Sequence, residues 1–188
     1  MDSVKYLSEY SADLNSRIQK TDFSKLGEIA DLIISAHRKN KIYTVGNGGS
    51  AATASHICND LLKGCAVGGN PGFDAECLAD SSAIITCLAN DFDYESIFSI
   101  PLATKAVSGD ILIAFSGSGN SKNVLNAAVK ARELGMTVIG FSGRDGGKLS
   151  ALCDIILIAP SDNMEQIEDL HMMYVHALSC CIQKQLSK

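Results

Sequence analysis

Two short loops rich in glycine and serine contain the residues best suited to chemistry in this chain. They are Gly46-Asn47-Gly48-Gly49-Ser50 and Ser116-Gly117-Ser118-Gly119-Asn120-Ser121. Each loop follows a strand-like apolar run and precedes a helix-like run, so bare backbone N–H groups, small hydroxyls and the positive end of a helix dipole come together. Because such groups bind phosphate, we expect a ligand phosphate at these loops.

The second loop offers the stronger phosphate signal. The hydroxyls of Ser116, Ser118 and Ser121 can donate to phosphate oxygens, while the amides around Gly119 and Asn120 point the same way. The alternative is an ordinary strand-to-helix turn in which Ser121 is only an N-cap. Three serines alternating with two glycines exceed what one cap requires, so the pattern favours phosphate binding. The absence of lysine from the loop indicates a terminal phosphomonoester held by neutral donors.

The first loop also fits the dinucleotide fingerprint G-x-G-x-x-[GA]. That fingerprint expects an acidic residue about 20 positions further on, where it holds a ribose hydroxyl. The corresponding stretch, Ala66 to Asn70, contains no acid. A nicotinamide cofactor is therefore disfavoured, and no G-x-x-x-x-G-K-[ST] motif of a P-loop occurs.

A second group of residues is suited to hold a divalent cation. His56 and Asp60 are four residues apart on a predicted helix, so they face the same way, and Glu168 and His176 are their counterparts near the C-terminus. Histidine nitrogen with carboxylate oxygen suits Zn²⁺ or a similar ion. The alternatives are a surface pair at 56 and 60, and a core histidine, His171, beside an exposed His176. Eight residues of helix separate Glu168 from His176 by ~12 Å, so both reach toward one ion or they serve different functions or subunits.

The composition predicts one domain, residues 1–188. With 188 residues, 46% of them hydrophobic, the chain can bury one core. The net charge of −5, with scattered basic residues, argues against a nucleic-acid partner. Seven cysteines without a Cys-x-x-Cys pair suit a reducing compartment. No apolar run has the length of a signal peptide or a membrane span, so we expect a cytoplasmic protein that does not bind membranes.

Hydrophobic periodicity then predicts the elements that position these residues. Helices are expected at 3–19, 23–39, 51–63, 94–107 (bent at Pro101), 121–134 and 163–185, and strands at 41–45, 82–88, 110–115, 136–141 and 154–159. Residues 65–80 are expected to be a loop and residues 143–147 a turn. Strands that alternate with helices favour a parallel sheet covered on both faces. We therefore predict an α/β sandwich of three layers, with both loops at the carboxyl ends of strands, where ligands bind.

Six motifs, spread over nearly the whole chain, carry a resemblance to a known family. They are Gly46–Ser50, His56, Asn90-Asp91-Phe92, Ser116–Ser121, Gly143–Lys148 and Glu168 with His171 and His176. Their order and spacing resemble the phosphoheptose isomerase branch of the sugar isomerase (SIS) domain family. The resemblance implies a five-stranded parallel sheet, with residues 1–40 as extra N-terminal helices that pack in a homotetramer, and active sites between subunits. It also implies conversion of sedoheptulose 7-phosphate to D-glycero-D-manno-heptose 7-phosphate.

The resemblance assigns roles to individual residues. The metal ligands would be His56, Asp60, Glu168 and His176, and the acid and base would be Asp60 and His176, with Asp60 and Glu168 able to exchange duties. The substrate-binding residues would be Asn47, Gly48, Ser50, Asn90, Asp91, Ser116, Gly117, Ser118, Asn120, Ser121 and Glu168. The chain departs from the family pattern where Asp60 replaces a glutamate, Glu168 a glutamine and Gly117 a threonine, and where Lys63-Gly64 replaces Gly-Arg.

The implied reaction is an aldose–ketose isomerisation through an enediolate. A base removes a proton from C1 of the open-chain ketose and the proton returns to C2, while a divalent ion stabilises the developing negative charge as a Lewis acid. Two alternatives remain: a non-catalytic SIS scaffold for a protein such as the replication initiator, and a sugar-phosphate sensor. Four ionisable groups at the metal positions favour the enzyme, since a scaffold needs none of them. Five- or six-carbon sugar phosphates are alternative substrates.

Overall fold

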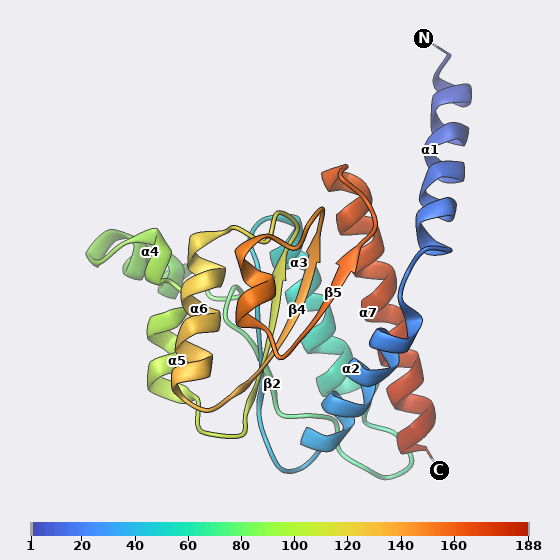
Figure 1. Cartoon of the computed structure of the whole chain (residues 1–188). Helices are drawn as coiled ribbons and strands as arrows, with labels where there is room; N and C mark the ends of the chain where they lie inside the picture. Colours follow the sequence, from blue (N-terminus) through green and yellow to red (C-terminus); the bar gives the residue numbers. More distant parts are fainter. Residues whose placement is uncertain (1, 188) are drawn as a thin grey trace.

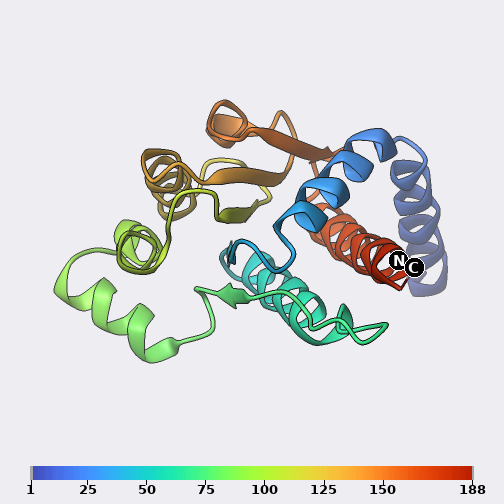
Figure 2. The same cartoon turned by 90° about the horizontal axis from the view of Figure 1, so that it is seen from below.

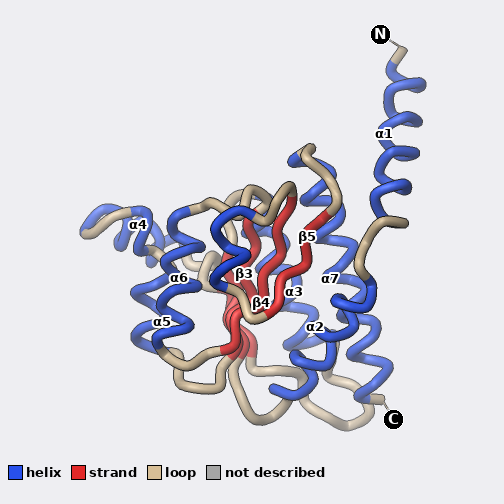
Figure 3. The backbone as a smooth tube through the Cα atoms, viewed as in Figure 1, coloured by secondary structure: helices blue, strands red, loops and turns tan. Residues whose placement is uncertain are grey.

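The computed structural model, which describes residues 2–187, is built on a parallel sheet of five strands in the order β2-β1-β3-β4-β5 (Figure 3). The strands are β1 (Ile42–Val45), β2 (Ala75–Cys77), β3 (Ile111–Ser116), β4 (Thr137–Gly143) and β5 (Ile155–Ala159). Every residue of the central strand β3 is buried, as expected for apolar strands covered on both faces. The predicted α/β fold with a five-stranded parallel sheet is confirmed.

Helices cover the sheet on both faces (Figures 1 and 2). They are α1 (Ser3–Ile18), α2 (Phe23–Ala36), α3 (Gly49–Asn59), α4 (Ser82–Asp91), α5 (Ser99–Lys105), α6 (Lys122–Glu133) and α7 (Met164–Leu186). Alternate side chains of β3 point to opposite faces. Ile113 and Phe115 join a core with α2, α3 and α7. Leu112 and Ala114 join a second core with α5 and α6.

The prediction of a strand at 82–88 was wrong. This segment forms α4, capped by Ser81, whose hydroxyl accepts a hydrogen bond from the Ile84 N–H. A short apolar run does not distinguish a strand from a helix by periodicity, and no residue of α4 is buried. The fifth strand is instead β2, inside the segment 65–80 that was expected to be a loop. It is three residues long and pairs with β1 alone.

Two predicted helices are divided. The expected helix at 51–63 consists of α3 followed by a π-helical turn at Asp60–Gly64. The expected helix at 94–107 consists of a 3₁₀ turn at Tyr94–Ser96 and then α5. Pro101 lies in the first turn of α5, where its missing N–H breaks no intrahelical hydrogen bond. A further 3₁₀ helix spans Gly147–Leu152.

The two N-terminal helices differ in their environment. Helix α2 belongs to the core of its own chain. Helix α1 has no buried residue and extends away from the body of the molecule (Figure 1). Its C-terminal half is attached to the body: Leu14 and Ile18 pack against the core, Tyr10 Oη donates to Asp169 Oδ2 (2.5 Å) and Gln166 Nε2 donates to Asp13 Oδ2 (2.8 Å). Within residues 2–187, no helix combines the length and the apolar character needed to cross a membrane.

Candidate active site

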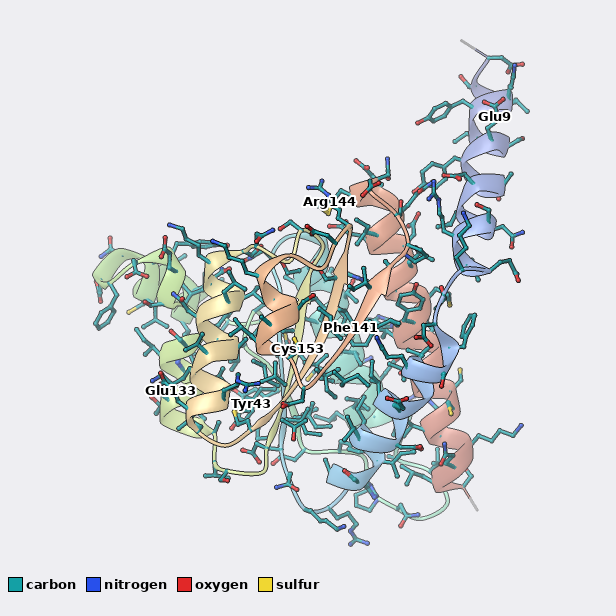
Figure 4. The ribbon with its side chains drawn as sticks, viewed as in Figure 1. Glu9, Tyr43, Glu133, Phe141, Arg144 and Cys153 are labelled. Atoms are coloured by element: carbon teal, nitrogen blue, oxygen red, sulfur yellow. The ribbon has the colours of Figure 1, made fainter. Side chains whose placement is uncertain are left out.

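Both glycine and serine loops lie at the carboxyl ends of neighbouring strands, as predicted. The first follows β1 and the second follows β3, and these strands pair in the middle of the sheet. The strand order 2-1-3-4-5 reverses direction between β1 and β3, which is the position where ligands bind in open α/β sheets. Figure 4 marks Phe141 within the sheet and Arg144 above these strand ends.

An amide pair joins the two loops. Asn47 Nδ2 donates to Asn123 Oδ1, and Asn123 Nδ2 donates to Asn47 Oδ1, both at 2.8 Å. Tyr94 Oη also donates to Asn47 Oδ1 (3.0 Å). Asn47 was expected near the substrate, but Asn123 and Tyr94 were missed. Asn123 is 2% exposed. The sequence pattern that could have identified it is its spacing of four from Ala127 and of eight from Ala131, which puts this amide on the buried face of α6.

The serines of the second loop are arranged differently from an ordinary helix cap. Ser121 occupies the N-cap position of α6, yet its side chain makes no capping hydrogen bond. It lies instead beside the buried Ser116, whose Oγ is 3.3 Å from Ser121 Oγ. The Asn120 N–H donates to Ser118 Oγ (3.2 Å). The hydroxyl of Ser121 is therefore free of helix capping, which is what a phosphate contact requires.

The segment 143–149 packs against the second loop. Gly119 has φ +65°, and a Cβ on it would lie 2.0 Å from the carbonyl oxygen of Gly146, so the position requires glycine. The Leu149 N–H donates to the Gly119 carbonyl (3.0 Å), and the Lys148 N–H donates to Asn120 Oδ1 (3.2 Å). These contacts hold the loop in one conformation.

Three of the four predicted metal ligands come together between α3, the π turn and α7. His176 Nε2 is 2.9 Å from His56 Nε2, which is 3.6 Å from Asp60 Oδ2. One ligand atom from each residue lies within 4.8 Å of the others. Asp60 begins the π turn, since the Cys65 N–H donates to its carbonyl (2.9 Å), and such turns are frequent at functional sites.

This donor set fits a divalent cation. When two imidazole Nε2 atoms share a hydrogen bond, only one of them carries the proton. The other Nε2 has a lone pair that points toward the group formed by His56, Asp60 and His176. Two imidazole nitrogens and one carboxylate oxygen form a ligand set known from catalytic zinc sites, which leave a further position open. His56, Asp60 and His176 are therefore the residues that would hold the ion.

Glu168 lies outside this group of three. A Cβ on Gly49 would be 2.1 Å from Glu168 Oε2, so the carboxylate packs directly against the first turn of α3. Helix α7 thus presents Glu168 to the first loop and His176 to the cation group, in agreement with the ~12 Å that separates them along the helix axis. Ser50 lies in the same first turn and is buried, and Gly48 is its N-cap with φ +55°.

Asn90 and Asp91 are in a separate place. They end α4, are exposed, and pair with each other through Asn90 Nδ2 and Asp91 Oδ1 (2.8 Å). Among the described residues no hydrogen bond joins them to either loop. Helix α4 projects from the body beside α5 and α6 (Figure 1). The substrate role expected of these two residues stays a prediction.

Known proteins are similar to this chain over most of its length. The sequence model of the SIS domain matches residues 5–143. Phosphoheptose isomerase of Helicobacter pylori (strain Shi470) is 39% identical over 83% of this chain and 81% of its own. That of Trichlorobacter lovleyi is 39% identical over 97% of this chain and 93% of its own.

Solved structures show the same likeness over the whole fold. Phosphoheptose isomerase GmhA from Neisseria gonorrhoeae superposes with a TM-score of 0.89 at 29% identity, covering 96% of this chain and 98% of its own. A phosphoheptose isomerase from Francisella tularensis gives a TM-score of 0.91 at 29% identity, covering 98% of this chain and all of its own (100%).

Proposed function

The chain belongs to the SIS domain family and, within it, to the phosphoheptose isomerases, and we propose that it converts sedoheptulose 7-phosphate to D-glycero-D-manno-heptose 7-phosphate. As a phosphosugar isomerase it must bind a phosphate at one end of the substrate and move a proton at the other. The observation that carries the proposal is the convergence of His56, Asp60 and His176, about 10 Å along α3 from the first loop.

The phosphate end is assigned to the second loop. The Ser116, Ser118 and Ser121 hydroxyls and the free N–H groups at the start of α6 supply neutral donors at the positive end of a helix dipole. Asn47 and Ser50 at the first loop, together with Glu168 over Gly49, are placed to bind sugar hydroxyls between the two ends. Binding at both ends holds the open chain of the sugar in one orientation.

The reactive end is assigned to His176 and Asp60. A ketose carries its carbonyl at C2, so isomerisation requires one group to remove a proton from C1 and a group to return it at C2. His176 lies on α7 with His56 as its neighbour, which orients its ring. A divalent ion such as Zn²⁺, when bound by His56, Asp60 and His176, supplies positive charge next to the oxygens on which negative charge develops. To serve as a fourth ligand, Glu168 would have to leave Gly49.

This arrangement favours an enzyme over the two alternatives. A scaffold for a protein partner, or a sensor that only binds a sugar phosphate, needs no convergent imidazole and carboxylate groups beside the ligand site. His56 is half-buried and His176 is exposed, so the packing of a core does not account for either histidine. The three side chains instead present their ligand atoms to one point.

The proposal includes a homotetramer in the cytoplasm. Helix α1 exposes Val4, Tyr6 and Leu7 in its N-terminal half, at 74%, 52% and 66% of their surface. Packing of this helix against other subunits would bury that face. The cysteines at positions 58, 65, 77, 87, 153, 180 and 181 are all free, which suits a reducing compartment.

The test is to incubate the purified protein with ketose phosphates of five, six and seven carbons and to follow aldose formation by NMR. We expect turnover of the seven-carbon substrate, loss of turnover with a chelator, and recovery on adding Zn²⁺. Formation of no aldose from any substrate would contradict the enzyme. Full turnover in the chelator would contradict the cation site.

A further inference from the structure

One buried histidine has no part in the reaction proposed above. His171 lies on α7 and is 0% exposed. Its ring packs among the aromatic rings of Phe115, Phe141 and Tyr174, with centroids 6.0, 6.1 and 6.4 Å away. Burying an imidazole among apolar groups costs free energy unless its polar atoms are used. A residue retained at that cost calls for an explanation beyond filling space.

The polar atoms of His171 are used on one side only. Nε2 is 3.0 Å from the Ser142 carbonyl oxygen. Because a carbonyl can only accept, Nε2 carries the proton and Nδ1 has the lone pair. Nδ1 is buried and finds no partner among the described residues. Burial lowers the pKa of His171 to about 4, so the ring is neutral at physiological pH and remains a single, fixed donor.

That donor leads to the proposed phosphate loop through Ser142. The Ser142 hydroxyl donates to the Ser116 carbonyl (2.8 Å), which also accepts from the Gly119 N–H (2.9 Å). The two serines are partners in the register of β3 and β4. One residue further on, the Gly143 N–H donates to the Gly117 carbonyl (3.1 Å). The end of β4 is therefore hydrogen-bonded to the start of the second loop, and His171 is hydrogen-bonded to the end of β4.

We propose that His171 is a positioning residue for phosphate binding: its Nε2–H fixes the Ser142 peptide, and the Ser142 hydroxyl fixes Ser116 at the start of the loop. The inference rests on the proposed function, since it assigns the phosphate to that loop. His171 touches no substrate. Its effect is to keep the Ser116 and Ser121 hydroxyls, 3.3 Å apart, in one arrangement before the ligand arrives, which lowers the ordering cost of binding.

Helix α7 contributes residues to three parts of the candidate site. The same helix presents Glu168 to the first loop, His171 to the support of the second loop, and His176 to the cation group. About 12 Å of helix spans all three. A single rigid element therefore sets the distance between the phosphate end and the reactive end of the site.

The experiment measures binding of inorganic phosphate and of Zn²⁺ by calorimetry, without turnover. His171→Leu removes the donor, Ser142→Ala removes the second link, and His171→Gln keeps an N–H at the place of Nε2. The controls are Tyr174→Phe and Ser179→Ala, which alter buried residues of α7 whose hydroxyls bond to Thr21 and to the Val175 carbonyl, away from the loop.

We expect His171→Leu and Ser142→Ala each to raise the Kd of phosphate about tenfold, the effect of losing one hydrogen bond. The Kd of Zn²⁺ stays as in the wild type, His171→Gln stays close to the wild type, and neither control weakens phosphate binding. If folded His171→Leu and Ser142→Ala bind phosphate as tightly as a wild type that isomerises the sugar, the positioning role is wrong while the proposed function stands. If the wild type itself binds no phosphate, the phosphate site and the positioning role are both wrong.

Discussion

The Nε2 atoms of His56 and His176 lie 2.9 Å apart, although 120 residues separate them in the chain. The contact exists because α3 and α7 run in parallel on the same face of the sheet: Gly49 meets Glu168 at one level, His56 meets His176 at the next, and Gly64 meets Gln183 beyond them. The pairing brings an imidazole from each helix to Asp60 at the start of the π turn.

Replacing either histidine by glutamine is expected to abolish both turnover and tight Zn²⁺ binding. Removal of an acid or base group costs 10²- to 10⁴-fold in rate, and a site with two ligands left holds the ion poorly. Circular dichroism and urea unfolding will show a wild-type fold, since neither side chain is buried. His37→Gln is the matched control, because among the described residues the His37 side chain has one hydrogen-bond partner, the Pro71 carbonyl, at the C-terminal end of α2. An active His176→Gln enzyme would refute the assigned role.

Removing the hydroxyls of Ser118 and Ser121 is expected to raise KM for the phosphorylated sugar about tenfold each, with a smaller change in kcat. On the sugar that lacks the phosphate, these variants should be as active as the wild type, because the two hydroxyls are assigned to the phosphate alone among the groups of the substrate. Steady-state kinetics with both substrates measures the difference. An equal loss for both substrates would contradict the phosphate assignment.

Unfolding separates phosphate binding from helix capping at Ser121. Ser121→Ala should change the free energy of unfolding by less than about 0.5 kcal/mol, since its hydroxyl makes no cap. Ser81→Ala should cost about 1 kcal/mol, because the Ser81 hydroxyl does cap α4. Equal losses in the two variants would favour the N-cap alternative.

Local patterns of the sequence were enough to predict where most residues of the candidate site lie. The loops at 46–50 and 116–121 depend on glycine and serine next to apolar strands, and the pairing of His56 with Asp60 depends on a spacing of four on one helix. Both are short-range properties, and the structure has them where expected. The separation of Glu168 from His176 also follows from helix geometry alone.

Other parts depend on contacts between distant segments. The Asn47–Asn123 amide pair joins residues 76 apart, and nothing local marks either as a partner of the other. The run at 82–88 is apolar enough for a strand, but the edge of the sheet beside β1 is occupied by β2, and the run forms α4, which has no buried residue. Tertiary position overrides local preference in such short segments.

Acid is expected to destabilise the fold through His171. Its pKa is lowered by burial from 6.5 to about 4, so below pH 6.5 the unfolded chain binds a proton that the native state does not. Stability from this group is therefore complete above pH 6.5 and falls as the pH drops toward 4, by about 3 kcal/mol. Urea unfolding between pH 4 and pH 7.5 measures the loss. In His171→Gln this component disappears, whereas His37→Gln keeps it, and identical pH profiles for wild type and His171→Gln would contradict the assignment.

Met164 is expected to exclude a larger residue from position 117. A Cβ on Gly117 would lie 2.5 Å from Met164 Sδ and 3.5 Å from Ile167 Cγ2, so Met164 occupies the space that a side chain at position 117 would need. Gly117→Thr alone should cost about 1 to 3 kcal/mol of stability through overpacking and weaken phosphate binding by displacing the loop.

Adding Met164→Ala to Gly117→Thr should recover both properties, because the smaller side chain makes room and the new hydroxyl adds a donor for phosphate. The free energies of unfolding and of phosphate binding are then non-additive across the double-mutant cycle. Met172→Ala is the matched control. Met172 is also on α7, but none of its atoms is among the three nearest to a Cβ built on Gly117, so this substitution should not rescue Gly117→Thr. Additive effects for Gly117 and Met164 would mean that the two positions do not share one space.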